Sequence, residues 1–139
     1  MEKRPEEMAY YQAQYARIEQ LNEAAGEEVV VFDPQGNDMA EWYQKIGIVV
    51  STSDFESFHL TLADGAASGS DAVSLAWDGA DLIYPESMLY SDVPTMAAGI
   101  LDPEATAHRR QDLAPVVAAF DERRVFDRFS ELLFAGARR

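Results

Sequence analysis

The fold is decided by residues 46–76, which read I-G-I-V-V-S-T-S-D-F-E-S-F-H-L-T-L-A-D-G-A-A-S-G-S-D-A-V-S-L-A. Residues 46–50 are an apolar run without polar alternation, which predicts a strand that is covered on both faces. After a polar loop, the spacing predicts a helix over residues 58–68 that is closed by Gly69. Residues 72–76 predict a further apolar strand. A strand, a helix and a second strand in this order indicate a parallel βαβ unit.

The same kind of pattern extends to both sides of this stretch. Upstream we expect a helix over residues 5–25, a strand over residues 28–32 with a turn after it, and a short helix that follows Asp38. Downstream we expect a weak helical turn over residues 80–84. Beyond Pro85 the pattern predicts three helices, over residues 93–101, 103–120 and 121–134.

These elements define an α/β fold, a partial doubly wound (Rossmann-like) parallel sheet of about three strands with flanking helices and a helical C-terminus. We expect a single domain over residues 1–139, with an α/β portion over residues 1–101 and C-terminal helices over residues 102–139. A complete doubly wound domain carries five or six strands and a phosphate loop after the first of them. The missing strands are expected upstream of Met1, so the chain has the pattern of a half-domain.

Composition excludes several classes of function. The chain has no cysteine, so disulfides and thiolate metal sites are excluded. Residues 1–107 hold 20 acidic and 4 basic side chains, whereas residues 108–139 hold 5 and 7, within a net charge of −14. Such acidity disfavours nucleic acid as a partner. No apolar run has the length of a membrane span and no secretory signal is visible, so we expect a cytoplasmic protein.

The most informative loop lies between the predicted strand at residues 46–50 and the helix at residues 58–68. Ligands of open parallel sheets bind beyond the carboxyl ends of the strands, where helix N-termini attract anions. Glu56 stands in this loop, and Asp64 follows eight residues later. We expect Asp64 to look back toward the site, while a face made of four apolar residues packs on the sheet, namely Leu60, Ala63, Ala66 and Ala67. Two carboxylates beside a helix N-terminus suit a phosphorylated sugar.

This stretch resembles the motif P-S-x-x-E-G-F-G-L-x-x-L-E-A-M-A-x-G of retaining GT-B glycosyltransferases with the E-x7-E motif (glycosyltransferase group 1, or family 4-like). Ser53, Glu56, Phe58, Leu60 and Gly69 match directly, and Asp64 stands in for the second glutamate. Seven residues separate the two carboxylates, as in the family. A weaker similarity covers nearly the whole chain, which would then be the C-terminal, donor-binding half of such an enzyme.

The resemblance implies a nucleotide-sugar donor and sugar transfer with retention, without a metal or a cofactor. Glu56 would be the catalytic residue, which contacts hydroxyls of the transferred sugar, and Asp64 would hold the ribose. The diphosphate would lie against the residues that open the helix, and the base near the turn that follows residues 28–32. The implied donor-binding residues are Glu56, Ser57, Phe58, His59, Leu60, Asp64 and Gly36.

Two features depart from the family. Ser57 and His59 replace two glycines that let phosphate approach the backbone closely. His59 can bring positive charge to the diphosphate or can serve as a hydrogen-bonded residue at the helix start. The family's basic pair lies in an upstream loop, and four basic residues before Ala107 offer no substitute. The isolated chain is therefore expected to be inactive without an N-terminal acceptor domain or a partner subunit.

Three hypotheses remain open at this point. The chain is the donor-binding part of a glycosyltransferase, a non-catalytic module that binds a nucleotide sugar, or an interaction protein. In the third case the exposed edge of a three-stranded sheet would pair with a partner or a second copy, giving a homo-oligomer.

Overall fold

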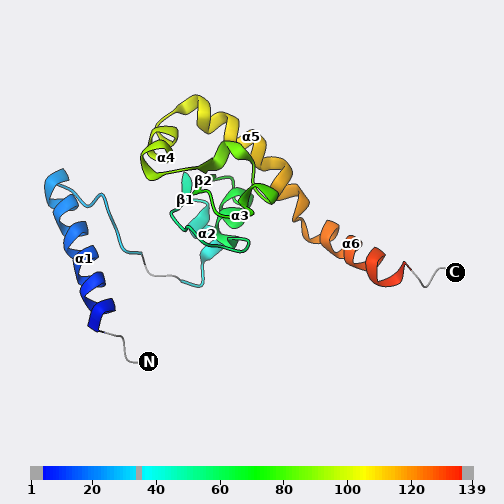
Figure 1. The fold of residues 1–139 in the computed structure, drawn as a ribbon, viewed down its shortest axis with the longest axis horizontal. Coiled ribbons are helices and arrows are strands. Elements are labelled where there is room, and N and C mark those ends of the chain that lie inside the picture. Colours follow the sequence, from blue (N-terminus) through cyan, green and yellow to red (C-terminus); the bar gives the residue numbers. More distant parts are fainter. Residues whose placement is uncertain (1–4, 34–35, 136–139) are drawn as a thin grey trace. The chain divides into compact units, whose positions relative to one another are not determined.

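The structure is a computed structural model that describes residues 5–33 and 36–135. The described chain forms two compact units, Met1–Asn37 and Asp38–Arg139 (Figure 1). All the strands of the described chain lie in the second unit. The candidate site is therefore built on that unit.

The first unit consists of helix α1, Pro5–Ala25, and the segment that follows it. The helix is confirmed, and Gly26 ends it in a left-handed conformation (φ 73°) that glycine adopts without strain. The predicted strand at residues 28–32 is wrong. The side chain of Asn22 accepts hydrogen bonds from the backbone N–H groups of Val29 and Val30 (2.9 and 2.8 Å) and donates one to the carbonyl of Val30. A side chain thus satisfies backbone groups that a strand would offer to a neighbouring strand.

The second unit contains a parallel sheet of three strands in the order β1-β2-β3, with β1 at Ile48–Ser51, β2 at Asp71–Leu75 and β3 at Leu89–Tyr90. The α/β class and the parallel sheet are confirmed. The third strand is not the predicted one. A strand of only two residues is too short to show a periodic pattern in the sequence. Leu89–Tyr90 becomes a strand only because it pairs with Ser74 and Leu75 of β2.

Five α-helices of this unit agree with the prediction to within two residues at each end. They are α2 at Met39–Tyr43, α3 at Leu60–Ala67, α4 at Val93–Ile100, α5 at Pro103–Ala119 and α6 at Glu122–Phe134. The predicted turn at residues 80–84 is the short 3₁₀ helix Ala80–Leu82, and a second one spans Glu86–Met88. Asp92, Asp102 and Asp121 accept hydrogen bonds from first-turn N–H groups of α4, α5 and α6, which explains why these helices begin where they do.

Helices cover β2 more completely than β1. Helices α3, α4 and α5 all pack against β2, and its first four residues are buried. On β1 the side chain of Val49 is buried, whereas that of Val50 is 47% exposed. The prediction that both faces of this strand are covered is wrong, because α3 packs on the face that carries Val49 and leaves the face of Val50 partly open.

Helix α3 presents a different face to the sheet from the one we expected. Leu62 and Gly65 are its buried residues, and Leu60 is exposed. A Cβ atom on Gly65 would lie 2.4 Å from Cγ2 of Val49, so the missing side chain is what lets α3 lie this close to β1. The expected face of Leu60, Ala63, Ala66 and Ala67 instead lines a groove beside α5.

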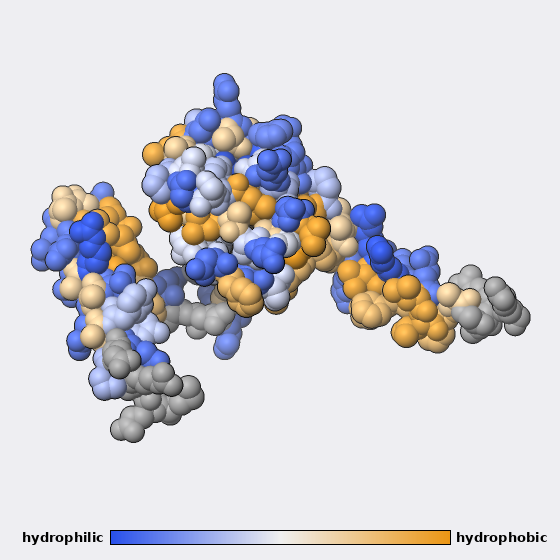
Figure 2. All heavy atoms as spheres, viewed as in Figure 1, coloured by the Kyte–Doolittle hydropathy of each residue, from blue (hydrophilic) through white to orange (hydrophobic). Residues whose placement is uncertain are grey.

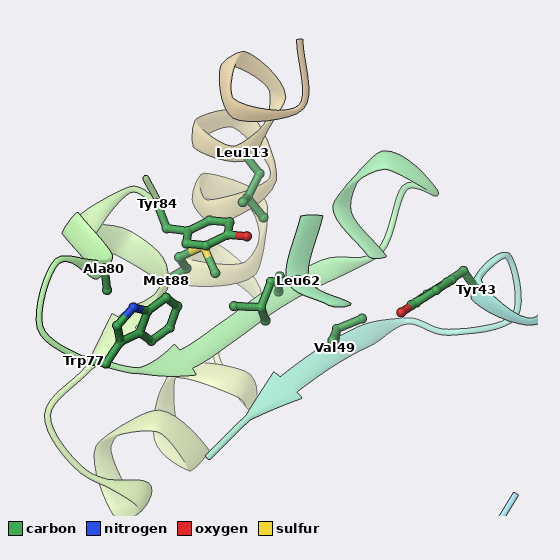
Figure 3. Packing of buried hydrophobic residues seen from close by; sticks show 9 residues of the cluster. Tyr43, Val49, Leu62, Trp77, Ala80, Tyr84, Met88 and Leu113 are labelled. Carbon is green, nitrogen blue, oxygen red and sulfur yellow. The ribbon is translucent and has the colours of Figure 1, made fainter. Parts of the chain in front are cut away.

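The core of the unit lies where α3, α5 and the strands meet (Figure 3). Leu62 and Met88 are fully buried, and Trp77, Tyr84 and Leu113 pack around them. Burying one such apolar side chain contributes about 1.5–3 kcal/mol. This core holds β1 and α3, the two elements that the candidate loop connects.

Candidate functional site

The predicted donor loop lies at the carboxyl end of β1. Strand β1 ends at Ser51, and the loop then runs to His59, which immediately precedes α3. Nε2 of His59 lies 2.7 Å from the hydroxyl oxygen of Ser51 and 3.8 Å from Oε1 of Glu56. The structure therefore brings His59 and Glu56 together, with the buried Ser51 beneath them.

The geometry of these three residues indicates what they can do chemically. Ser51 and Glu56 both approach the same ring nitrogen of His59, whereas a catalytic triad uses one nitrogen for the hydroxyl and the other for the acid. The three residues thus do not form a triad. The carboxylate of Glu56 is half-buried and able to accept hydrogen bonds from ligand hydroxyls.

His59 has an unusual backbone conformation. Its φ angle is 59°, and it is the one non-glycine residue with positive φ among the residues that the structure describes. The left-handed conformation costs roughly 1–2 kcal/mol for a residue with a Cβ atom. In the motif that the sequence resembles, this position is a glycine, and here the hydrogen bond to Ser51 offsets part of the cost.

This conformation leads to a prediction for two substitutions at one position. His59→Ala and His59→Gly both remove the imidazole, but only alanine keeps the left-handed strain. We expect the glycine variant to have a free energy of unfolding about 1 kcal/mol higher than the alanine variant. Urea titrations of both variants check this. Equal stabilities, or a more stable alanine variant, would show that the backbone at His59 is not strained.

Tyr84 holds the loop by hydrogen bonds, a role that sequence reasoning missed because only a helical turn is predicted there. Its hydroxyl group lies within hydrogen-bonding distance of the carbonyls of Phe58 and His59 (3.0 and 3.2 Å) and donates to them. Burial, with a smaller contribution from the negative charge of Asp64, raises the pKa of Tyr84 to about 12. The phenol is therefore protonated at neutral pH and can act as the donor.

Trp77 completes the support of this loop. It follows the carboxyl end of β2, is buried, and lies with its ring 6.0 Å from the imidazole of His59 (centroid to centroid). Its burial makes Trp77 a packing residue of the core rather than an open platform for a nucleotide base.

The other predicted donor-binding residues do not lie together but are spread over a groove, the loop and the first unit. Phe58, Leu60 and Asp64 line a largely apolar groove of about 400 Å³ between α3 and α5, in which Asp64 is the charged lining residue. Ser57 is exposed in the loop. Gly36 belongs to the first unit, whereas all the others belong to the second.

Two arginines of α5 lie at the amino ends of the strands, whereas Glu56 lies at the carboxyl end of β1. Arg109 forms a buried ion pair with Asp71, the first residue of β2, and Arg110 donates to the carbonyl of Gly47, just before β1. These two cations stand at the amino ends of the strands, so neither takes the place of the family's basic pair at the carboxyl ends.

Within residues 5–33 and 36–135, no three His, Asp or Glu side chains come together as a metal would require. In the same ranges no helix combines the length and the apolar composition that crossing a bilayer demands. Comparison of the chain with protein-family models, with curated proteins and with solved structures finds no match.

Proposed function

We propose that this chain binds a nucleotide sugar at the carboxyl edge of its sheet, as a doubly wound half-domain of GT-B glycosyltransferase descent. The observation that carries the proposal is the position of Glu56 and His59. They lie together at the carboxyl end of β1, directly before α3, with His59 in a left-handed conformation where the resembled motif has glycine. The position at which the motif has a glycine is thus also the position at which this backbone has a positive φ angle, which supports the alignment with the motif.

In this proposal the parts of the site have separate tasks. Glu56 accepts hydrogen bonds from the sugar hydroxyls. The first two N–H groups of α3, those of Leu60 and Thr61, hold the diphosphate, since the start of a helix leaves such groups without a carbonyl partner in the helix. The next N–H group, that of Leu62, already donates to the carbonyl of His59. His59 contributes positive charge when protonated. Asp64 is assigned to the ribose, in the groove that Phe58 and Leu60 also line.

The proposed site binds the nucleotide sugar, but transfer of the sugar needs groups that this chain does not provide there. Stabilising a departing diphosphate is an electrostatic task that requires cations near it. Arg109 and Arg110 stand at the other edge of the sheet. An acceptor domain or a partner subunit would therefore supply both the acceptor and the cations.

Isothermal titration of the chain with UDP-, GDP- and ADP-glucose tests the proposal. We expect heat with one of these donors, and we expect Glu56→Gln to weaken that binding about tenfold, because a hydrogen bond to a charged group contributes about 1.5–3 kcal/mol. Glu104→Gln is the matched control, since Glu104 is an exposed glutamate of α5. No heat with any donor, or equal losses in the two variants, would overturn the proposal.

A further inference from the structure

Helix α6 has an apolar face that is exposed to solvent. Val125, Phe126, Phe129, Leu132 and Leu133 recur at helical spacing, and α6 has no buried residue. Leu132 is 73% exposed and Phe129 59%. Figure 2 shows these hydrophobic side chains gathered along one side of α6. A contiguous apolar face of this size on a helix marks an interaction site.

A second uncovered apolar surface lies in the same unit, namely the groove between α3 and α5. Its walls are Phe58 and Leu60 on one side, Val116, Val117 and Phe120 on the other, and the alanines of α3 between them. Small residues such as Ala63, Ala66 and Ala67 let a helix approach closely, which is typical of grooves that receive an amphipathic helix.

We propose that the α3–α5 groove of one copy receives α6 of a second copy, and that the exchange is reciprocal. Such a dimer covers both apolar surfaces of each chain with one kind of contact. A pairing of α6 with α6 would cover the helices and leave both grooves open. A reciprocal exchange is also closed by twofold symmetry, so it ends at two copies.

The charges favour a second copy over a membrane surface. Three arginines on α6 (Arg123, Arg124 and Arg128) are balanced by three acidic residues (Glu122, Asp127 and Glu131), so the helix is neutral. Helices that bind anionic lipid carry a clear excess of basic residues. The groove offers the carboxylate of Asp64 to these arginines, so docking of α6 and binding of a ribose by Asp64 exclude each other. A neutral helix is also not repelled by the acidic remainder of the unit.

The area is sufficient for a dimer. A large apolar side chain offers roughly 150–250 Å² when fully exposed, so each α6 face presents about 600 Å². Two such faces bury about 1,200 Å², and the two groove walls add to this, so the interface falls within the ~1,200–2,000 Å² of stable complexes.

The junction between α5 and α6 favours docking of α6 in the groove of a second copy over folding of α6 back into the groove of its own chain. Two residues, Phe120 and Asp121, separate the helices. Arg124 donates a hydrogen bond to the carbonyl of Ala118, and the ring of Phe120 packs on that of Phe58 (4.8 Å between centroids). These contacts hold α6 so that it continues beyond α5, away from the sheet (Figure 1). A short connection held in this way promotes exchange between copies.

Directed disulfides test the proposal, because the chain has no cysteine of its own. Ala67→Cys lies in the groove and Leu132→Cys on α6, and both positions are exposed. We expect an equal mixture of the two single variants to form the mixed disulfide dimer under mild oxidation. A dominant Leu132→Cys homodimer would instead show pairing of α6 with α6. A double variant that is cross-linked as a monomer would show closure within one chain, and either result would overturn the proposal.

Solution mass gives a second readout. We expect sedimentation equilibrium to show a dimer whose dissociation constant rises about tenfold or more in Phe129→Asp and in Ala67→Arg. Phe55→Asp is the matched control, since Phe55 is 88% exposed but lies in the loop after β1. A monomer at all concentrations, including one that binds phosphatidylglycerol vesicles through α6, contradicts the exchange, as does an equal effect of the Phe55 variant.

Discussion

Replacing Arg109 with alanine is expected to lower the free energy of unfolding of the second unit by about 3–5 kcal/mol, because it leaves the carboxylate of Asp71 buried and unpaired. Arg109 is fully buried, and its Nη2 lies 2.6 Å from Oδ2 of Asp71. It also donates to the hydroxyl of Tyr90, to the carbonyl of Gly99 and to the hydroxyl of Thr106. One side chain thus connects β2, β3, α4 and α5.

The charge of Arg109 is maintained despite its burial. Burial by itself disfavours the guanidinium cation and would lower its pKa. The hydrogen bonds and negative charge of Asp71 outweigh this cost, and the pKa of Arg109 is raised above its usual value. The pair therefore stays ionised, and removing one partner leaves a full charge behind.

Urea unfolding followed by tryptophan fluorescence measures the effect, because both tryptophans, Trp42 and Trp77, belong to the second unit. Arg110→Ala is the matched control, since the neighbouring arginine is exposed and its loss should change stability by no more than about 0.5 kcal/mol. The double variant Arg109→Leu with Asp71→Leu should recover much of the loss, since it buries no unpaired charge. A loss in Arg109→Ala of under about 1 kcal/mol would contradict the role assigned to the pair.

Replacing Gly65 with valine is expected to cost about 3 kcal/mol, although valine is preferred to glycine inside a helix by a few tenths of a kcal/mol. The new Cβ atom would lie 2.4 Å from Cγ2 of Val49 and 3.3 Å from its Cβ, so α3 must move away from β1. The same urea titration measures the change.

Ala67→Val makes a matched control on the same helix when the chain is titrated at concentrations where it is monomeric, because Ala67 is then exposed on the groove side. We expect this variant to change stability by less than about 0.5 kcal/mol. Adding Val49→Ala to Gly65→Val should restore part of the loss, because it removes the methyl group that causes the overlap. If Gly65→Val and Ala67→Val were equally stable, the close approach of α3 to β1 would not be what limits this position.

Much of the candidate site followed from local sequence alone. The apolar run before Ser51 and the periodic residues after His59 determine a strand, a loop and a helix, since hydrophobic periodicity is a local property. The position of Glu56 at the carboxyl end of a parallel strand follows from that order. The contact of His59 with Ser51 and Glu56 did not follow, because it depends on a left-handed backbone that a histidine rarely adopts.

The sequence by itself determined the helices and the two longer strands of the second unit, because periodic burial and capping aspartates act over a few neighbouring residues. Only the tertiary structure decided the rest. Residues 28–32 have the composition of a strand but bond to Asn22, whereas Leu89–Tyr90 becomes a strand by pairing with β2. Likewise, Arg109 looks like a solvated residue in the sequence, yet it is buried because Asp71, 38 residues away, neutralises it. Strand pairing and ion pairing join residues that are distant along the chain, so local patterns do not carry them.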